Sequence, residues 1–126
     1  MARLLILVAL ATGFATPGAS SARPPGAEAG ADYFRGHCVM CHGNTATTPP
    51  GIGPRLFGVV GRPSGSLPGY AYSSAMKRAG LVWDPATLRR YVASPQSVVR
   101  GNKMPFQGIS NPHDADNVVA YLATLH

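Results

Sequence analysis

The sequence predicts an all-α protein of three to five short helices joined by long loops. Helix-start signals recur along its 126 residues, whereas no segment alternates apolar and polar residues as a half-buried strand does. The stretch 43–68 is rich in glycine and proline and has neither a helical nor a strand period, so we expect extended loops there. A loop of this length is uncommon in a compact domain unless it encloses something.

The first two helices are expected on either side of this loop region. Residues 27–37 read as helical, with Phe34 placed to face the core. A second, short helix is expected over 73–79, because Ser73 or Ser74 can cap its start and Gly80 can supply its left-handed end.

Two further helices are marked by a capping residue that precedes a proline, which suits the first helical position. These pairs are Asp84-Pro85 and Asn111-Pro112, and Ser94-Pro95 is expected to end the earlier of the two helices. The last helix carries its apolar residues on one face: Val118, Tyr121, Leu122 and Leu125.

Residues 1–22 are expected to be a secretory signal peptide. Arg3 gives a positive start, an apolar run covers 4–15, and small residues follow at 19–22. The apolar run is shorter than the roughly 20 residues that a membrane-spanning helix needs, so a permanent anchor is the weaker alternative. The remaining residues, 23–126, suffice for a single domain.

The charge pattern argues against nucleic-acid binding. The chain has 11 Lys and Arg against 5 Asp and Glu, a formal net charge of +6. The basic residues are scattered, with Arg89-Arg90 as the longest cluster, so they form no stripe that could follow a phosphate backbone.

The most specific motif is C-x-x-C-H at Cys38-Val39-Met40-Cys41-His42, which is typical of covalent attachment of a c-type haem. Cys38 and Cys41 can each bond a vinyl group of one porphyrin, and His42 can ligate the iron. A zinc site would need more ligands than two cysteines provide. A redox dithiol would need a preceding strand, and a structural disulfide would leave His42 without a role. In bacteria haem is attached covalently outside the cytoplasmic membrane, so the motif agrees with an exported, periplasmic protein.

The second axial ligand is expected to be Met104, which lies in a loop bounded by glycines. A methionine alone is more often a core residue than a ligand, but the haem motif favours the ligand role here. Met76 is set aside because it lies on a helix with basic neighbours. His37 is too near the haem motif to reach the opposite face, and His113 and His126 read as exposed residues at helix ends.

At this point the chain resembles class I cytochrome c, of the mitochondrial and purple-bacterial soluble type. Gly30 and Phe34 match one side of the family's crossing between first and last helices, and Tyr121-Leu122 match the other side. The segment 53–58 resembles the family segment whose proline carbonyl accepts the N–H of the axial histidine, and 101–104 resembles its methionine loop.

This resemblance implies roles for five further residues. Pro54 would orient the axial histidine, Tyr72 and Trp83 would hydrogen-bond a buried haem propionate, and Arg62 would lie near the same propionate. Tyr91 would pack beside the methionine ligand. Without the resemblance, the aromatic residues read as ordinary core and the arginine as a solvated charge.

The resemblance implies a periplasmic, monomeric electron carrier with one covalently bound haem c, and not an enzyme, since histidine and methionine leave the iron no open position. Its partners would be a quinol-oxidising cytochrome complex and a terminal oxidase or photosynthetic reaction centre. An alternative is the haem-bearing subunit of a periplasmic dehydrogenase, and a haem peroxidase is disfavoured by Met104.

The lysine ring of mitochondrial members is largely missing. Only Lys103, Arg100 and Arg55 would face a partner, so we expect docking to depend weakly on salt. Apolar residues near the presumed haem edge would supply contact area instead: Val98, Pro105 and Phe106.

Overall fold

The computed structural model describes residues 22–126. The predicted signal peptide, 1–22, lies outside the described residues except for its last position. No helix within 22–126 is both long enough and apolar enough to cross a bilayer.

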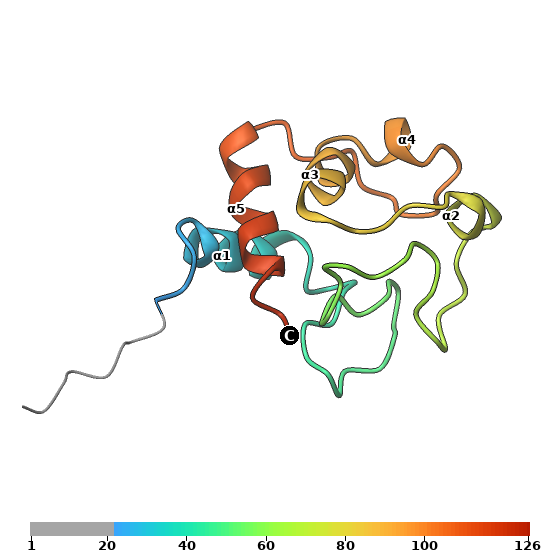
Figure 1. The fold of residues 1–126 in the computed structure, drawn as a ribbon, viewed down its shortest axis with the longest axis horizontal. Helices are drawn as coiled ribbons and strands as arrows, with labels where there is room; N and C mark the ends of the chain where they lie inside the picture. The colour runs from blue at the N-terminus through green and yellow to red at the C-terminus, as the bar shows by residue number, and fades with distance from the viewer. Residues whose placement is uncertain (1–21) are drawn as a thin grey trace, which may run out of the picture.

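The all-α prediction is confirmed over the described chain. Five helices follow one another in the order α1 (Ala27–His37), α2 (Ser74–Arg78), α3 (Pro85–Ala93), α4 (Pro95–Val98) and α5 (Pro112–Leu122) (Figure 1). Across 22–126 the only β pairing is an isolated antiparallel bridge between Pro63 and Val82.

Side-chain caps start three of these helices where the sequence predicts. The Ser73 hydroxyl and the Asp84 carboxylate each accept the backbone N–H three residues further on, at 3.1 and 2.7 Å. The Asn111 side chain accepts the N–H two residues further on, at 2.9 Å. Gly80, with φ of +65°, follows α2 in the left-handed conformation expected of a helix stop.

The helix α4 was not predicted. Ser94-Pro95 was expected only to end the preceding helix, and α3 does end at Ala93. However, the same proline also occupies the first helical position of α4, where its missing N–H is not needed. One dipeptide therefore both ends a helix and starts the next.

The crossing of α1 over α5 fixes the first and last helices against each other, as Figure 1 shows. Gly30 permits the close approach, because a Cβ there would lie 1.9 Å from the Asn117 carbonyl oxygen. Next to it the rings of Phe34, which is fully buried, and Tyr121 pack at 5.3 Å between centroids. This contact places the end of α1, and hence Cys38, against the core.

The remaining helices and the long loops pack around the same core as α1 and α5. The segment between α1 and α2 runs as loops on one side, while α3 and α4 lie on the other (Figure 1). Buried residues from all these parts join one core cluster, among them Val59, Met76, Trp83, Leu88, Val99, Ile109 and Val118.

Candidate haem-binding site

A cavity of about 610 Å³ lies between the helices and the loops. Its volume is in the range of ligand pockets, about 300–1,000 Å³, and its walls are mostly apolar. All the residues that the sequence singled out for the site line it: Cys38, Cys41, His42, Pro54, Arg62, Tyr72, Trp83, Tyr91 and Met104.

The two cysteines lie where α1 gives way to a tight turn. Cys38 is the C-terminal cap of α1, and its carbonyl oxygen accepts the N–H groups of Cys41 and His42 at 3.0 and 2.9 Å. The two thiols are free and half-buried. Burial, and secondarily the proximity of Cys41, raises the pKa of Cys38 to about 11.

The zinc alternative lacks ligands in the part of the chain that the structure describes. A reactive dithiol has at least one thiol whose pKa is lowered, whereas the pKa of Cys38 is raised. In addition, no three His, Cys, Asp or Glu side chains within 22–126 are grouped so as to hold a metal ion. The pair is placed instead to bond a group inside the cavity.

His42 is held in one tautomer and orientation. Its Nδ1 lies 2.7 Å from the carbonyl oxygen of Pro54, which can only accept, so Nδ1 carries the proton and Nε2 keeps its lone pair. Burial lowers the pKa of His42, although the Pro54 hydrogen bond opposes this shift, so the ring is kept neutral. A neutral imidazole with a free Nε2 is the form that ligates iron.

Gly53 is part of the same arrangement, because its missing side chain leaves room for the histidine. A Cβ at this position would lie 2.6 Å from Cε1 of His42 and 2.8 Å from its Nδ1. The Gly53 N–H also donates to the Cys41 carbonyl oxygen at 2.8 Å, which ties this loop to the haem motif.

The loop that carries Met104 is held in place by hydrogen bonds of the buried side-chain amide of Asn102. The Asn102 side-chain oxygen accepts the Met104 N–H at 2.9 Å, and its Nδ2 donates to the Val99 carbonyl at 2.9 Å. Gln96 of α4 adds two bonds, donating to the Asn102 carbonyl at 3.0 Å and accepting from the Gly101 N–H at 3.1 Å. The unpredicted helix α4 therefore helps to fix the methionine.

A second set of contacts joins this loop to another segment that lines the cavity. The Lys103 ammonium donates to the Ala71 carbonyl and lies 4.7 Å above the Tyr70 ring, a cation–π contact. The Tyr70 hydroxyl in turn donates to the Ile52 carbonyl at 3.0 Å. Sequence analysis missed Tyr70 because this role depends on three loops meeting in space.

Arg62 is half-buried rather than solvated. Its guanidinium donates to the carbonyl oxygens of Arg55, at 3.0 Å, and Phe57. Burial lowers its pKa from the usual value, but arginine remains a cation. Tyr72 also lines the cavity and interacts with Arg62, and its hydroxyl accepts the Leu67 N–H at 3.3 Å.

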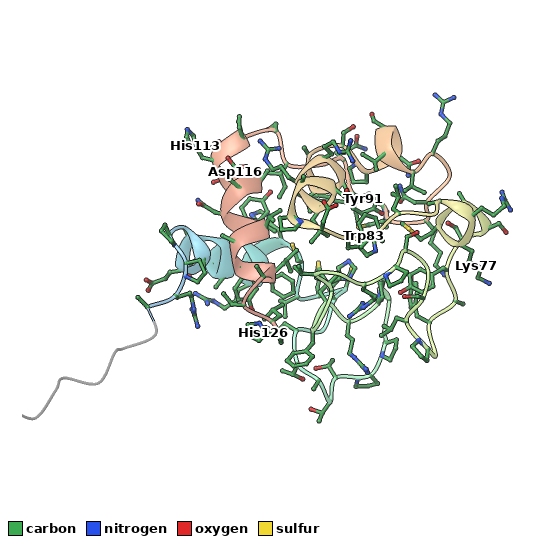
Figure 2. The ribbon with its side chains drawn as sticks, viewed as in Figure 1. Lys77, Trp83, Tyr91, His113, Asp116 and His126 are labelled. Carbon is green, nitrogen blue, oxygen red and sulfur yellow. The ribbon has the colours of Figure 1, made fainter. Side chains whose placement is uncertain are left out.

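Trp83 and Tyr91 form an aromatic pair in the cavity wall, with ring centroids 4.9 Å apart (Figure 2). Trp83 is buried, and burial raises the pKa of Tyr91 to about 12, with Tyr70 adding to the shift. The Tyr91 hydroxyl therefore stays protonated and can act as a hydrogen-bond donor at neutral pH.

Met76 also reaches the cavity, contrary to the reason for setting it aside. It is buried, with 8% of its surface exposed, and lines the same cavity as Met104. Its basic neighbour Lys77 points to the outside (Figure 2), because successive helical residues face different directions. His113 and His126 are exposed and do not line the cavity, whereas His37 lies at its edge.

Comparison with known proteins places this site in a family, since the family model for cytochrome c matches residues 27–126. The chain belongs to the cytochrome c family. It is 51% identical over 89 residues to cytochrome c2 of Rhodomicrobium vannielii, covering 71% of each protein. It is 42% identical to cytochrome c2 of Rhodopila globiformis, covering 81% of this chain and 96% of that protein.

A solved structure agrees with this assignment. Cytochrome cH from Methylobacterium extorquens superposes with a TM-score of 0.72 at 44% identity, covering 78% of this chain and 97% of that one. The protein is thus a class I cytochrome c that binds one covalently attached haem c and transfers electrons to and from protein partners, and it is not an enzyme.

Proposed function

We propose that the protein is a periplasmic electron carrier whose haem is bonded by Cys38 and Cys41 and ligated by His42 and Met104. The observation that carries this proposal is the fixed tautomer of His42, whose Nδ1–H donates to Pro54 and whose Nε2 is left free at the cavity. The haem supplies a one-electron iron couple, and a thioether ligand raises its potential.

The chain's own contribution is to keep both ligands still. Pro54 orients His42, while Asn102 and Lys103 fasten the loop of Met104. Because these loops are held by bonds that do not involve the iron, little rearrangement accompanies a change of one electron. Such a site suits rapid outer-sphere transfer between a quinol-oxidising cytochrome complex and a terminal oxidase or reaction centre.

The thioethers of Met104 and Met76 both line the cavity, so replacing each in turn tests which of them ligates the iron. Met104→Leu and Met76→Leu both conserve side-chain volume and remove only a thioether. Met104→Leu should abolish the weak sulfur-to-iron charge-transfer band of the oxidised protein and lower its potential, whereas Met76→Leu should retain the band. Loss of the band in Met76→Leu alone would make Met76 the ligand, and an absent band in the wild type would exclude both.

The location and the domain boundary are proposed together. Residues 1–22 would be removed on export and 23–126 would form the cytochrome domain, which is supported by the apolar run at 4–15 and by the family match beginning at 27. The intact mass of the native protein, after acid-acetone treatment, should equal 23–126 plus one haem. A mass that includes the first residues, or haem that is extracted, would contradict this proposal.

A further inference from the structure

The segment 100–108, which carries Met104, has few hydrogen bonds to the rest of the protein. Its two ends are anchored by the buried side chains of Val99 and Ile109, and the Ile109 N–H donates to the Val92 carbonyl oxygen at 2.8 Å. Between these ends, the backbone–backbone hydrogen bonds of the described chain run only to Val99 or within the segment itself. Side chains therefore have to hold the segment in place.

Gln96 of α4 is the one residue outside this segment, among those described, whose side chain hydrogen-bonds to it. Its Nε2 donates to the Asn102 carbonyl oxygen at 3.0 Å, and its Oε1 accepts the Gly101 N–H at 3.1 Å. A side-chain amide carries both a donor and an acceptor, as this stretch of backbone does, so one residue satisfies both groups. Because the Asn102 side-chain oxygen accepts the Met104 N–H, a chain of hydrogen bonds runs from α4 to Met104.

The bonds of Gln96 are accessible to water. Gln96 and Gly101 are both exposed, whereas Asn102 is buried. Segments held by exposed hydrogen bonds open locally at a low free energy, since water replaces those bonds. The other side-chain attachment of the segment runs through Lys103, whose flexible four-carbon stem permits the backbone to move.

We propose that Gln96 is a positioning residue for Met104, whose release lets the segment 100–108 open, and which otherwise keeps small uncharged bases out of the cavity. This inference rests on the proposed ligation by Met104. Gln96 is not among the described residues that line the cavity, so it acts only through the backbone of Gly101 and Asn102.

Gln96→Ala removes both bonds and tests this role by two measurements. Hydrogen exchange of the Met104 N–H, followed by NMR in the reduced protein, should lose about five- to twentyfold in protection, as expected for two partly exposed hydrogen bonds. The apparent affinity of the oxidised protein for imidazole, read from loss of the charge-transfer band, should rise by a similar factor. An affinity of this kind scales with the fraction of molecules that are open.

Gln96→Glu adds a pH dependence that a purely structural role would not produce. The carboxylate still accepts the Gly101 N–H, but its second oxygen faces the Asn102 carbonyl oxygen without a proton. Protection of the Met104 N–H should therefore be low at pH 6 and recover partly towards pH 4, because a protonated carboxyl, with an ordinary pKa of about 4.3, donates as the amide does. Gln96→Ala should show no such recovery.

Ser97→Ala is the matched control, because Ser97 is the next exposed residue of α4 and its hydroxyl bonds only to that of Ser94. Its Met104 N–H should exchange as in the wild type. Equal protection in Gln96→Ala and Ser97→Ala would overturn the proposal, as would an equal loss of protection at the slowest amides of α5, which would indicate general destabilisation. Failure of the proposed function is distinguishable: the oxidised wild type would lack the charge-transfer band, while hydrogen exchange would still decide whether Gln96 holds the segment.

Discussion

Gly53→Ala is expected to displace the proposed axial histidine. The added methyl carbon would lie 2.6 Å from Cε1 and 2.8 Å from Nδ1 of His42, and 3.1 Å from the Cys41 carbonyl oxygen. Non-bonded heavy atoms normally approach no closer than about 3.5 Å, so the ring has to move by about 1 Å. Such a movement stretches the 2.7 Å hydrogen bond to Pro54 beyond the usual range.

The expected loss of stability follows from these two effects. Overpacking typically costs about 1–3 kcal/mol and a lost hydrogen bond about 0.5–1.5 kcal/mol, so Gly53→Ala should lower the free energy of unfolding by about 1.5–4.5 kcal/mol. The potential should also rise, because an imidazole without its hydrogen-bonded partner is a weaker donor to ferric iron. Guanidinium unfolding followed by Trp83 fluorescence, together with redox titration of the haem band, measures both quantities.

Gly51→Ala is the matched control for this experiment. It lies two residues away, and no described atom would lie within 4 Å of its Cβ, so its stability should stay within about 0.5 kcal/mol of the wild type. Equal stabilities and equal potentials for the two variants would refute the reasoning that Gly53 makes room for the histidine.

Three further predictions concern the fold and its loops. Gly30→Ala should destabilise the protein by about 3 kcal/mol, because its Cβ would lie 1.9 Å from the α5 backbone. The control is Gly36→Ala on the same helix, whose Cβ would meet no described atom within 4 Å. Its free energy of unfolding, measured with denaturant, should rise by about 0.5–1 kcal/mol. Tyr70→Phe removes the hydroxyl bond to Ile52 but keeps the ring beneath Lys103. The loop should therefore be less stable by about 1 kcal/mol, and the charge-transfer band should disappear at a lower denaturant concentration. An unchanged midpoint would show that this bond does not hold the loop. The fold raises the pKa of Tyr91 to about 12, above the unfolded value of about 10, so the folded state favours the protonated hydroxyl. The resulting stabilisation is complete below about pH 10 and is lost as the pH rises to about 12. When the free energy of unfolding is measured from about pH 9 to 12, Tyr91→Phe should therefore lose less stability than the wild type.

Several features of the protein were predictable from its sequence because their causes are local. Ser73, Asp84 and Asn111 cap helices through atoms two or three residues away, so the sequence alone placed those starts. The spacing of Cys38, Cys41 and His42 likewise lies within a single turn of chain. The resemblance to class I cytochrome c, now confirmed by the family match, added the crossing of α1 and α5.

Other features depend on contacts between distant segments, and only the tertiary structure decided them. The direction of Met76 depends on how α2 packs on the core, so its basic neighbours misled the sequence argument. The link from Lys103 through Tyr70 to Ile52 joins loops 18 and more residues apart. The fold also brings Ile52 beside the haem motif, and both line the main cavity. Local sequence thus determined which residues can cap, bond or ligate, whereas long-range packing determined which of them share one cavity.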